Sequence, residues 1–77
     1  MPWTVRLHTI PEDQLEALKE YCYSACLNDP TFKFTVEEEN GKISYVVIEC
    51  ESRDQAFKRG VLFHHRFGCF FEVEWRR

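Results

Sequence analysis

The sequence lacks most of the features that would reveal a chemical activity. It contains three glycines in 77 residues, and they do not form the glycine-rich loop that cradles phosphate groups. No apolar run is long enough to span a lipid bilayer, and there is no internal repeat, linker or low-complexity segment. We therefore expect neither a P-loop protein nor a helical membrane protein, but a single domain over residues 1–77.

An excess of positive charge is also absent. Ten Lys and Arg residues stand against thirteen Asp and Glu residues, which gives a net charge of −3. General nucleic-acid-binding proteins usually carry a clear positive field, so this balance argues against that class. Aromatic residues, in contrast, make up 16% of the chain. Large rings bury much apolar area with few residues, which predicts a folded globular domain.

Four cysteines are present, Cys22, Cys26, Cys50 and Cys69. An even number could form two disulfides in a secreted protein. Residues 1–3 lead directly into strand-like sequence without the apolar segment of a signal peptide, so we expect reduced thiols and a cytoplasmic location. Cys22 and Cys26 do not have the C-x-x-C spacing of redox motifs, and buried core positions explain them better.

The clearest structural signal is the pair Asn40-Gly41, which lies between two strand-like segments. Both residues tolerate a positive φ, and their turn matches the twist of two paired strands, so the pair predicts a β-hairpin. A two-residue turn would pair Phe34 with Val47, whereas a longer turn with a bulged glycine would pair Phe34 with Val46. The sequence leaves both registers open, and the register decides which side chains of the second strand are exposed.

The remaining elements complete a familiar order. Alternating apolar residues predict strands over 3–8 and 69–75, and helical spacing predicts two helices that begin with capping boxes at Thr9 and Ser52. Gly60 lies near the centre of the second apolar stripe, where we expect a close approach of the sheet or of the first helix. The order βαββαβ predicts an α+β, ferredoxin-like fold: a four-stranded antiparallel sheet with two helices on one face.

In this topology, three histidines and one cysteine fall near one end of the domain: His8, His64, His65 and Cys69. Imidazole and thiolate are common metal ligands, so these residues form a candidate metal site. The alternative is that His64 and Cys69 are packed core residues and that His65 is a surface cation near a helix C-terminus. No serine has an adjacent base in the sequence, and we expect no catalytic centre and no cofactor.

The second predicted helix is basic on its solvent side, through Arg53, Lys58, Arg59 and Arg66. This makes nucleic-acid binding an alternative function. Glutamates on the exposed sheet face would repel phosphate, and the third strand lacks the glycine–aromatic pattern of an RNA-recognition module.

Apolar side chains without an obvious internal partner favour protein binding instead. The candidate residues are Ile43, Tyr45, Val47, Leu62 and Phe70. Contiguous apolar patches on small soluble proteins usually mark interfaces. The sequence therefore predicts a small non-catalytic regulator or inhibitor that docks on a partner protein, or a homodimer formed through the sheet.

Overall fold

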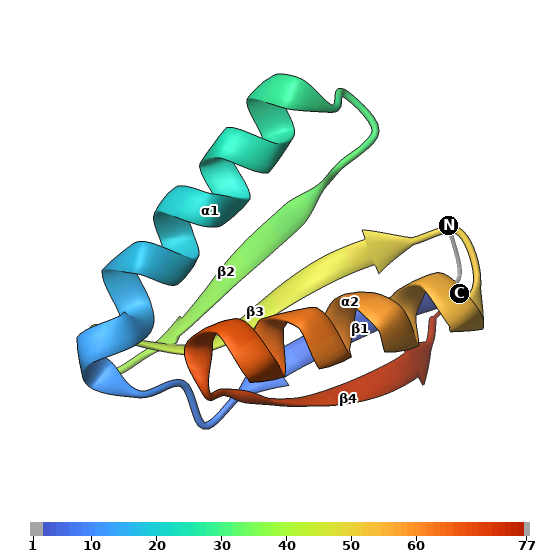
Figure 1. Ribbon diagram of the computed structural model, residues 1–77. Helices are drawn as coiled ribbons and strands as arrows, with labels where there is room; N and C mark the ends of the chain where they lie inside the picture. Colours follow the sequence, from blue (N-terminus) through green and yellow to red (C-terminus); the bar gives the residue numbers. More distant parts are fainter. Residues whose placement is uncertain (1–2, 77) are drawn as a thin grey trace.

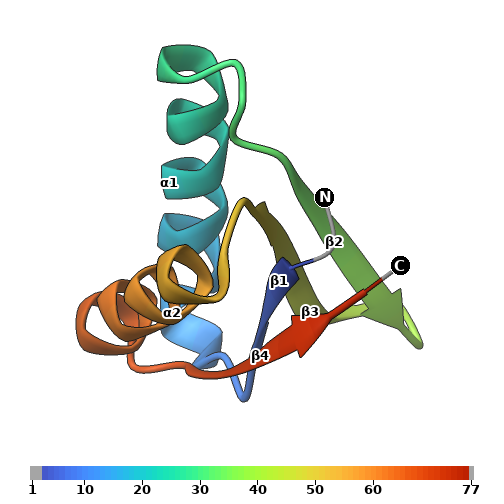
Figure 2. The same cartoon turned by 90° about the vertical axis from the view of Figure 1, so that its right-hand side faces the viewer.

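A computed structural model describes residues 3–76 of the chain. In chain order (Figure 1), the elements are β1 (Trp3–His8), the 3₁₀ turn η1 (Glu12–Gln14), α1 (Leu15–Asn28), β2 (Phe34–Glu39), β3 (Lys42–Cys50), α2 (Arg53–Phe67) and β4 (Phe70–Trp75). The strands form one antiparallel sheet in the order β2-β3-β1-β4. Both helices lie on the same face of this sheet (Figure 2). The predicted α+β, ferredoxin-like fold is confirmed.

The tight turn predicted between the two middle elements is present. Asn40 and Gly41 connect β2 to β3 with φ angles of 55° and 78°, and such positive values suit a two-residue hairpin turn. Next to the turn, Glu39 lies opposite Lys42, as a two-residue loop requires. The hairpin is therefore formed by the residues that predicted it.

A one-residue bulge then changes the register of this hairpin. Ile43 and Tyr45 lie opposite adjacent residues of β2, so Ser44 between them has no partner there. Beyond the bulge, Phe34 pairs with Ile48, a register that differs from both predicted alternatives. Because side chains alternate between the two faces of a strand, one extra residue reverses the faces of all the residues that follow.

The bulge divides β3 into a buried side and an exposed side. Val46, Ile48 and Cys50 face the helices and belong to the core, which they form together with β1. Tyr45 and Val47 alternate with them and face the other side of the sheet. We call that side, which no helix covers in Figure 2, the open face.

α2 is the helix that packs most closely on the sheet. Its first turn is capped by Ser52, whose Oγ accepts a hydrogen bond from the backbone N–H of Gln55 at 3.1 Å, and it ends at Gly68 with φ 75°. A Cβ atom at Gly60 would collide with the ring of Phe71 on β4. The expected close approach at Gly60 is thus to the sheet.

α1 begins differently from the prediction. Thr9 does not cap it: its φ is 51° and its Oγ1 lies 2.9 Å from Nδ1 of His8. The chain enters the helix through the turn η1, in which the N–H of Gln14 donates to the carbonyl of Pro11 at 2.9 Å. The capping box predicted at Thr9 is wrong because its side chain contacts β1 instead of the helix end.

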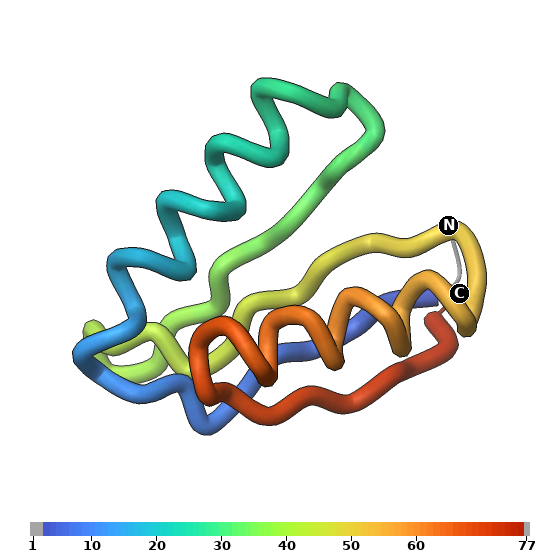
Figure 3. The backbone as a smooth tube through the Cα atoms, viewed as in Figure 1, coloured from blue at the N-terminus to red at the C-terminus, as the bar shows by residue number. Residues whose placement is uncertain are grey.

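α1 also diverges from α2, as the backbone trace shows (Figure 3). The two helices meet at Tyr21, whose ring packs edge-on against Phe63 and Phe67 with centroid distances of 5.3 and 5.9 Å. Further along α1 the contacts decrease, and Leu27 is 87% exposed. The core therefore lies mainly between α2, the first half of α1 and the inner strands.

Replacing Gly60 by alanine should destabilise the protein, although alanine is the better helix former. Forcing an extra methyl group into a packed contact typically costs about 1–3 kcal/mol, and the gain in helix propensity is about 1 kcal/mol. We expect a lower urea midpoint for Gly60→Ala, measured by circular dichroism. Lys58→Ala, at an exposed position of α2, should stay within about 0.5 kcal/mol of the wild type. A more stable Gly60→Ala variant would contradict the close contact with Phe71.

Candidate functional site

The open face is the main candidate for a functional surface. It is built from alternate residues of all four strands, which the pairing of the strands places on one side: Thr4, Arg6, His8, Thr35, Glu37, Tyr45, Val47, Glu49, Phe70, Glu72 and Glu74. Charged and polar side chains dominate this set. The open face therefore lacks the large apolar area that a stacked, sheet-on-sheet homodimer would bury.

Arg6 lies at the centre of the open face. Its Nη2 donates to Oε1 of Glu72 at 2.7 Å and lies 3.7 Å from Oε2 of Glu74. Its guanidinium carbon is 4.9 Å from the centre of the Tyr45 ring. The hydrogen bond with Glu72 is the main cause of a raised pKa for Arg6. Val47, directly opposite on β3, is only 6% exposed in this environment.

Two polar atoms on this face lack a hydrogen-bond partner. Within residues 3–76, Thr4 Oγ1 and Arg6 Nε are the buried side-chain nitrogen and oxygen atoms without one. A buried polar group that is left unpaired costs its full desolvation free energy, so native structures contain few of them. Both atoms belong to β1, an inner strand, and both lie on the face that the helices leave uncovered. Their position makes the area around Thr4 and Arg6 the part of the open face to examine for a functional role.

The residues predicted for protein binding lie on two different surfaces and, in one case, against the core. Tyr45 and Val47 are on the open face, and Phe70 lies at its edge with 51% of its surface exposed. Leu62 lies on the solvent side of α2 and is 44% exposed. Ile43 packs against the core, so its assignment to the exposed set is wrong. The adjacent bulge turns it toward the helices, and strict alternation in the sequence gives no sign of that bulge.

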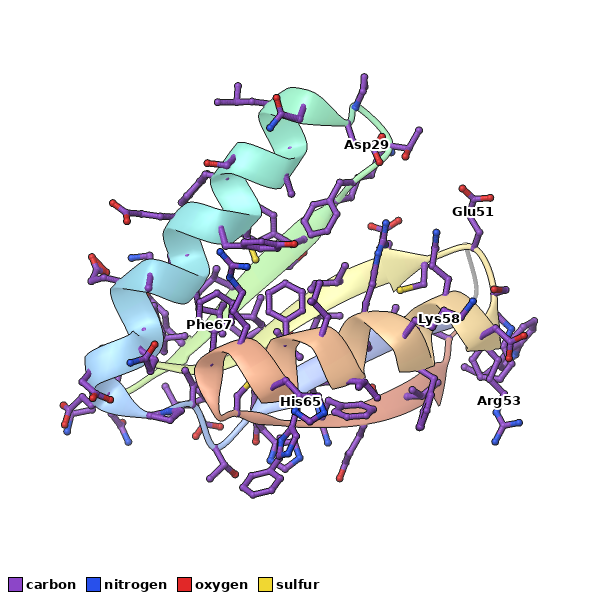
Figure 4. The ribbon with its side chains drawn as sticks, viewed as in Figure 1. Asp29, Glu51, Arg53, Lys58, His65 and Phe67 are labelled. Carbon is purple, nitrogen blue, oxygen red and sulfur yellow. The ribbon has the colours of Figure 1, made fainter. Side chains whose placement is uncertain are left out.

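The predicted metal ligands are not gathered into a ligand set. The ring of Phe70 lies near the imidazoles of both His8 and His64, with centroid distances of 6.4 and 5.4 Å. Nδ1 of His64 is 2.8 Å from the carbonyl oxygen of Cys69, whose own thiol is buried and contacts a main-chain carbonyl of α2. His65 projects from α2 (Figure 4) and is exposed. In the described part of the chain, no three His, Cys, Asp or Glu residues are arranged to hold a metal ion.

The four basic residues of α2 do not form a continuous free surface. Arg59 donates to a main-chain carbonyl of β3 at 2.8 Å and lies 5.0 Å above the ring of Phe32. Arg66 lies 5.0 Å above a tyrosine ring of α1. Arg53 and Lys58 are exposed, and Arg53 points outward at the N-terminal end of the helix (Figure 4). Two of the four basic side chains that were candidates for binding nucleic acid are therefore engaged in contacts within the protein.

The four cysteines are free thiols, and three of them are buried. Burial raises the pKa of Cys22 to about 12, and it also raises the pKa values of Cys50 and Cys69. Cys26 is partly buried and donates to the carbonyl of Phe32 at 3.2 Å. The thiolate is the reactive form of cysteine. The three buried thiols are therefore poor nucleophiles at neutral pH.

Known proteins give no guide to the function of this surface. No protein-family model, curated protein sequence or solved structure matches the chain. Within residues 3–76, neither α-helix has the length and apolar character needed to cross a membrane. The residues of the open face are thus the basis of the functional proposal.

The buried thiol of Cys22 should weaken the protein in alkaline solution. Its pKa rises from 9.0 to about 12 in the folded state, because burial disfavours the thiolate. The stability that the neutral thiol gives to the folded state is fully present below about pH 9, and it is lost as the pH rises from 9 toward 12. We expect the free energy of unfolding to fall less steeply above pH 9 in Cys22→Ala than in the wild type, as measured by urea titrations on both sides of that pH. Parallel curves would show that Cys22 does not contribute.

Proposed function

We propose that this chain is a small, non-catalytic protein-binding module that docks on a partner protein through the open face and thereby regulates or inhibits that partner. The observation that carries the proposal is the pair of unpartnered polar atoms on β1, Thr4 Oγ1 and Arg6 Nε, on a face that no helix covers. A partner that rearranges the surface side chains can supply the missing hydrogen bonds. Two unpaired polar groups destabilise the free protein, and the complex removes this destabilisation when it provides their hydrogen bonds.

The side chains around Arg6 support this proposal. Arginine and aromatic residues are enriched among the few residues that carry most of the binding energy at protein interfaces. The open face places the guanidinium of Arg6 over Tyr45, and the half-exposed ring of Phe70 lies at its edge. Phe70 already contacts His8 and His64, so its ring loses little freedom when a partner covers it.

A partner other than a second copy fits the charges better. Acidic side chains outnumber basic ones on the open face, with Glu37, Glu49, Glu72 and Glu74 around Arg6. A twofold contact through this face would bring these carboxylates together, which is unfavourable. We therefore favour a different protein over the homodimer.

We also place the module in the cytoplasm, a reducing compartment in which free thiols persist.

Affinity capture from the native host with matched variants tests the proposal. Phe70→Ala removes an exposed ring at the open face, and Tyr23→Ala removes an equally exposed ring from α1 (51% and 57% exposed). We expect one protein, identified by mass spectrometry, to be captured by the wild type and by Tyr23→Ala, and to be recovered about tenfold less with Phe70→Ala, as for an interface hot spot. Circular dichroism should show that both variants fold.

Two outcomes would contradict the proposal. The first is equal recovery of the same proteins by both variants, which would place any binding surface elsewhere. The second is recovery of nucleic acid by the wild type, lost when Arg53 and Lys58 are replaced, which would favour the basic helix. Sedimentation velocity on the purified protein separately tests self-association, and a Phe70-dependent dimer would replace the partner with a second copy.

A further inference from the structure

A shallow hollow of about 290 Å³ crosses the open face. Its lining comes from all four strand regions and consists of Thr4, Thr35, Glu37, Val47, Glu49 and Arg76. Pockets for drug-sized ligands usually begin at about this volume and extend to roughly 1,000 Å³. The hollow therefore suits the end of a single side chain better than a large ligand.

The lining has the chemistry of a site for an organic cation. Glu37 and Glu49 supply two carboxylates, and neither forms an ion pair within residues 3–76. Thr4 and Thr35 supply hydroxyl oxygens that can accept hydrogen bonds from N–H donors. Charge-assisted hydrogen bonds of this kind are stronger than neutral ones. A phosphate or carboxylate would instead meet two like charges.

Thr4 gives independent evidence that the hollow is used. The residue is 4% exposed, lines the hollow, and its Oγ1 has no hydrogen-bond partner among the described residues. Valine has nearly the same shape and would avoid the cost of an unpaired hydroxyl. A buried hydroxyl that harms the free protein is expected where the hydroxyl acts in a complex.

We propose that this hollow receives a lysine or arginine side chain of the partner protein. The ammonium or guanidinium group lies between the carboxylates of Glu37 and Glu49. Once the side chains that cover Thr4 Oγ1 in the free protein move aside, it donates a hydrogen bond to that atom. This inference rests on the proposed function and names the chemistry of the partner. It also explains the acidic excess of the open face, which attracts a basic surface and repels a second copy.

Arg76 places a positive charge beside the hollow in the free protein. It lines the same hollow, and its Nη2 lies 3.4 Å from Oε1 of Glu74. Its side chain is about half exposed and follows the end of β4, so it can move away without disturbing the core. Because its positive charge lies beside the hollow and repels an incoming cation, removal of this side chain should tighten binding.

A titration with a minimal probe tests the inference directly. The probe is N-acetyl-L-arginine amide, and N-acetyl-L-glutamine amide is the uncharged control. We expect saturable chemical-shift changes at the amides of Thr4, Thr35 and Val47 in ¹⁵N–¹H correlation spectra, with a dissociation constant on the order of millimolar. The control compound should cause no such changes.

Variants then separate the hollow from general electrostatics. Thr4→Val should weaken probe binding at least about threefold and raise the melting temperature, a combination that a purely structural role does not produce. Glu49→Gln should weaken binding by a similar factor, and Arg76→Ala should strengthen it. Glu20→Gln removes an exposed carboxylate from α1, away from the open face, and serves as the matched control, with binding close to that of the wild type.

The inference is overturned if the shifts do not saturate, if Glu20→Gln and Glu49→Gln have equal effects, or if Thr4→Val binds like the wild type. Failure of this inference is distinguishable from failure of the proposed function. Partner capture that depends on Phe70 but not on Thr4 or Glu49 would remove the cation site and leave the docking proposal in place. Capture that is independent of Phe70 would overturn the docking proposal itself.

Discussion

One unpaired residue in β3, Ser44, determines the two faces of this domain. Side chains alternate strictly along a strand, so a single inserted residue exchanges the buried and exposed sets on one side of it. With the bulge in place, Val46 and Ile48 complete the core, while Tyr45 and Val47 meet Arg6 on the open face. The contacts of Arg6 and the hollow beside it both depend on this register.

The helix-facing side and the open face are stabilised in different ways. On the helix side, α2 approaches the sheet so closely that only glycine fits at position 60, opposite Phe71. On the open face, Arg6 is held by exposed carboxylates and one aromatic ring, and Thr4 has an unpaired hydroxyl. Dense packing on one side allows the other side to keep groups that do not stabilise the free protein. Natural proteins depart from local rules of this kind mainly at functional sites, which is why the open face is the surface to test.

The basic character of α2 has an explanation within the fold. Arg59 reaches the end of β3 and the ring of Phe32, and Arg66 lies over Tyr21 on α1. The contact of Arg66 joins α2 to α1, and the contact of Arg59 joins α2 to the segment between α1 and β2. Arginine can fill this role because its long stem and flat guanidinium cover apolar surface while the charge stays hydrated. A basic helix face is therefore weak evidence for a nucleic-acid interface in this chain.

The sequence by itself determined the order of the elements, the hairpin turn at Asn40-Gly41, the cap at Ser52 and the end of α2 at Gly68, because these depend on backbone preferences over a few residues. The tertiary structure decided the bulge at Ser44, which depends on the simultaneous fit of β3 to β1, β2 and α2. The tertiary structure alone also decided which residues lie together in the candidate site. Thr4, Glu37 and Glu49 are far apart in the sequence and belong to three strands, so no local pattern brings them together. Their common position follows from strand order and register, which long-range packing selects.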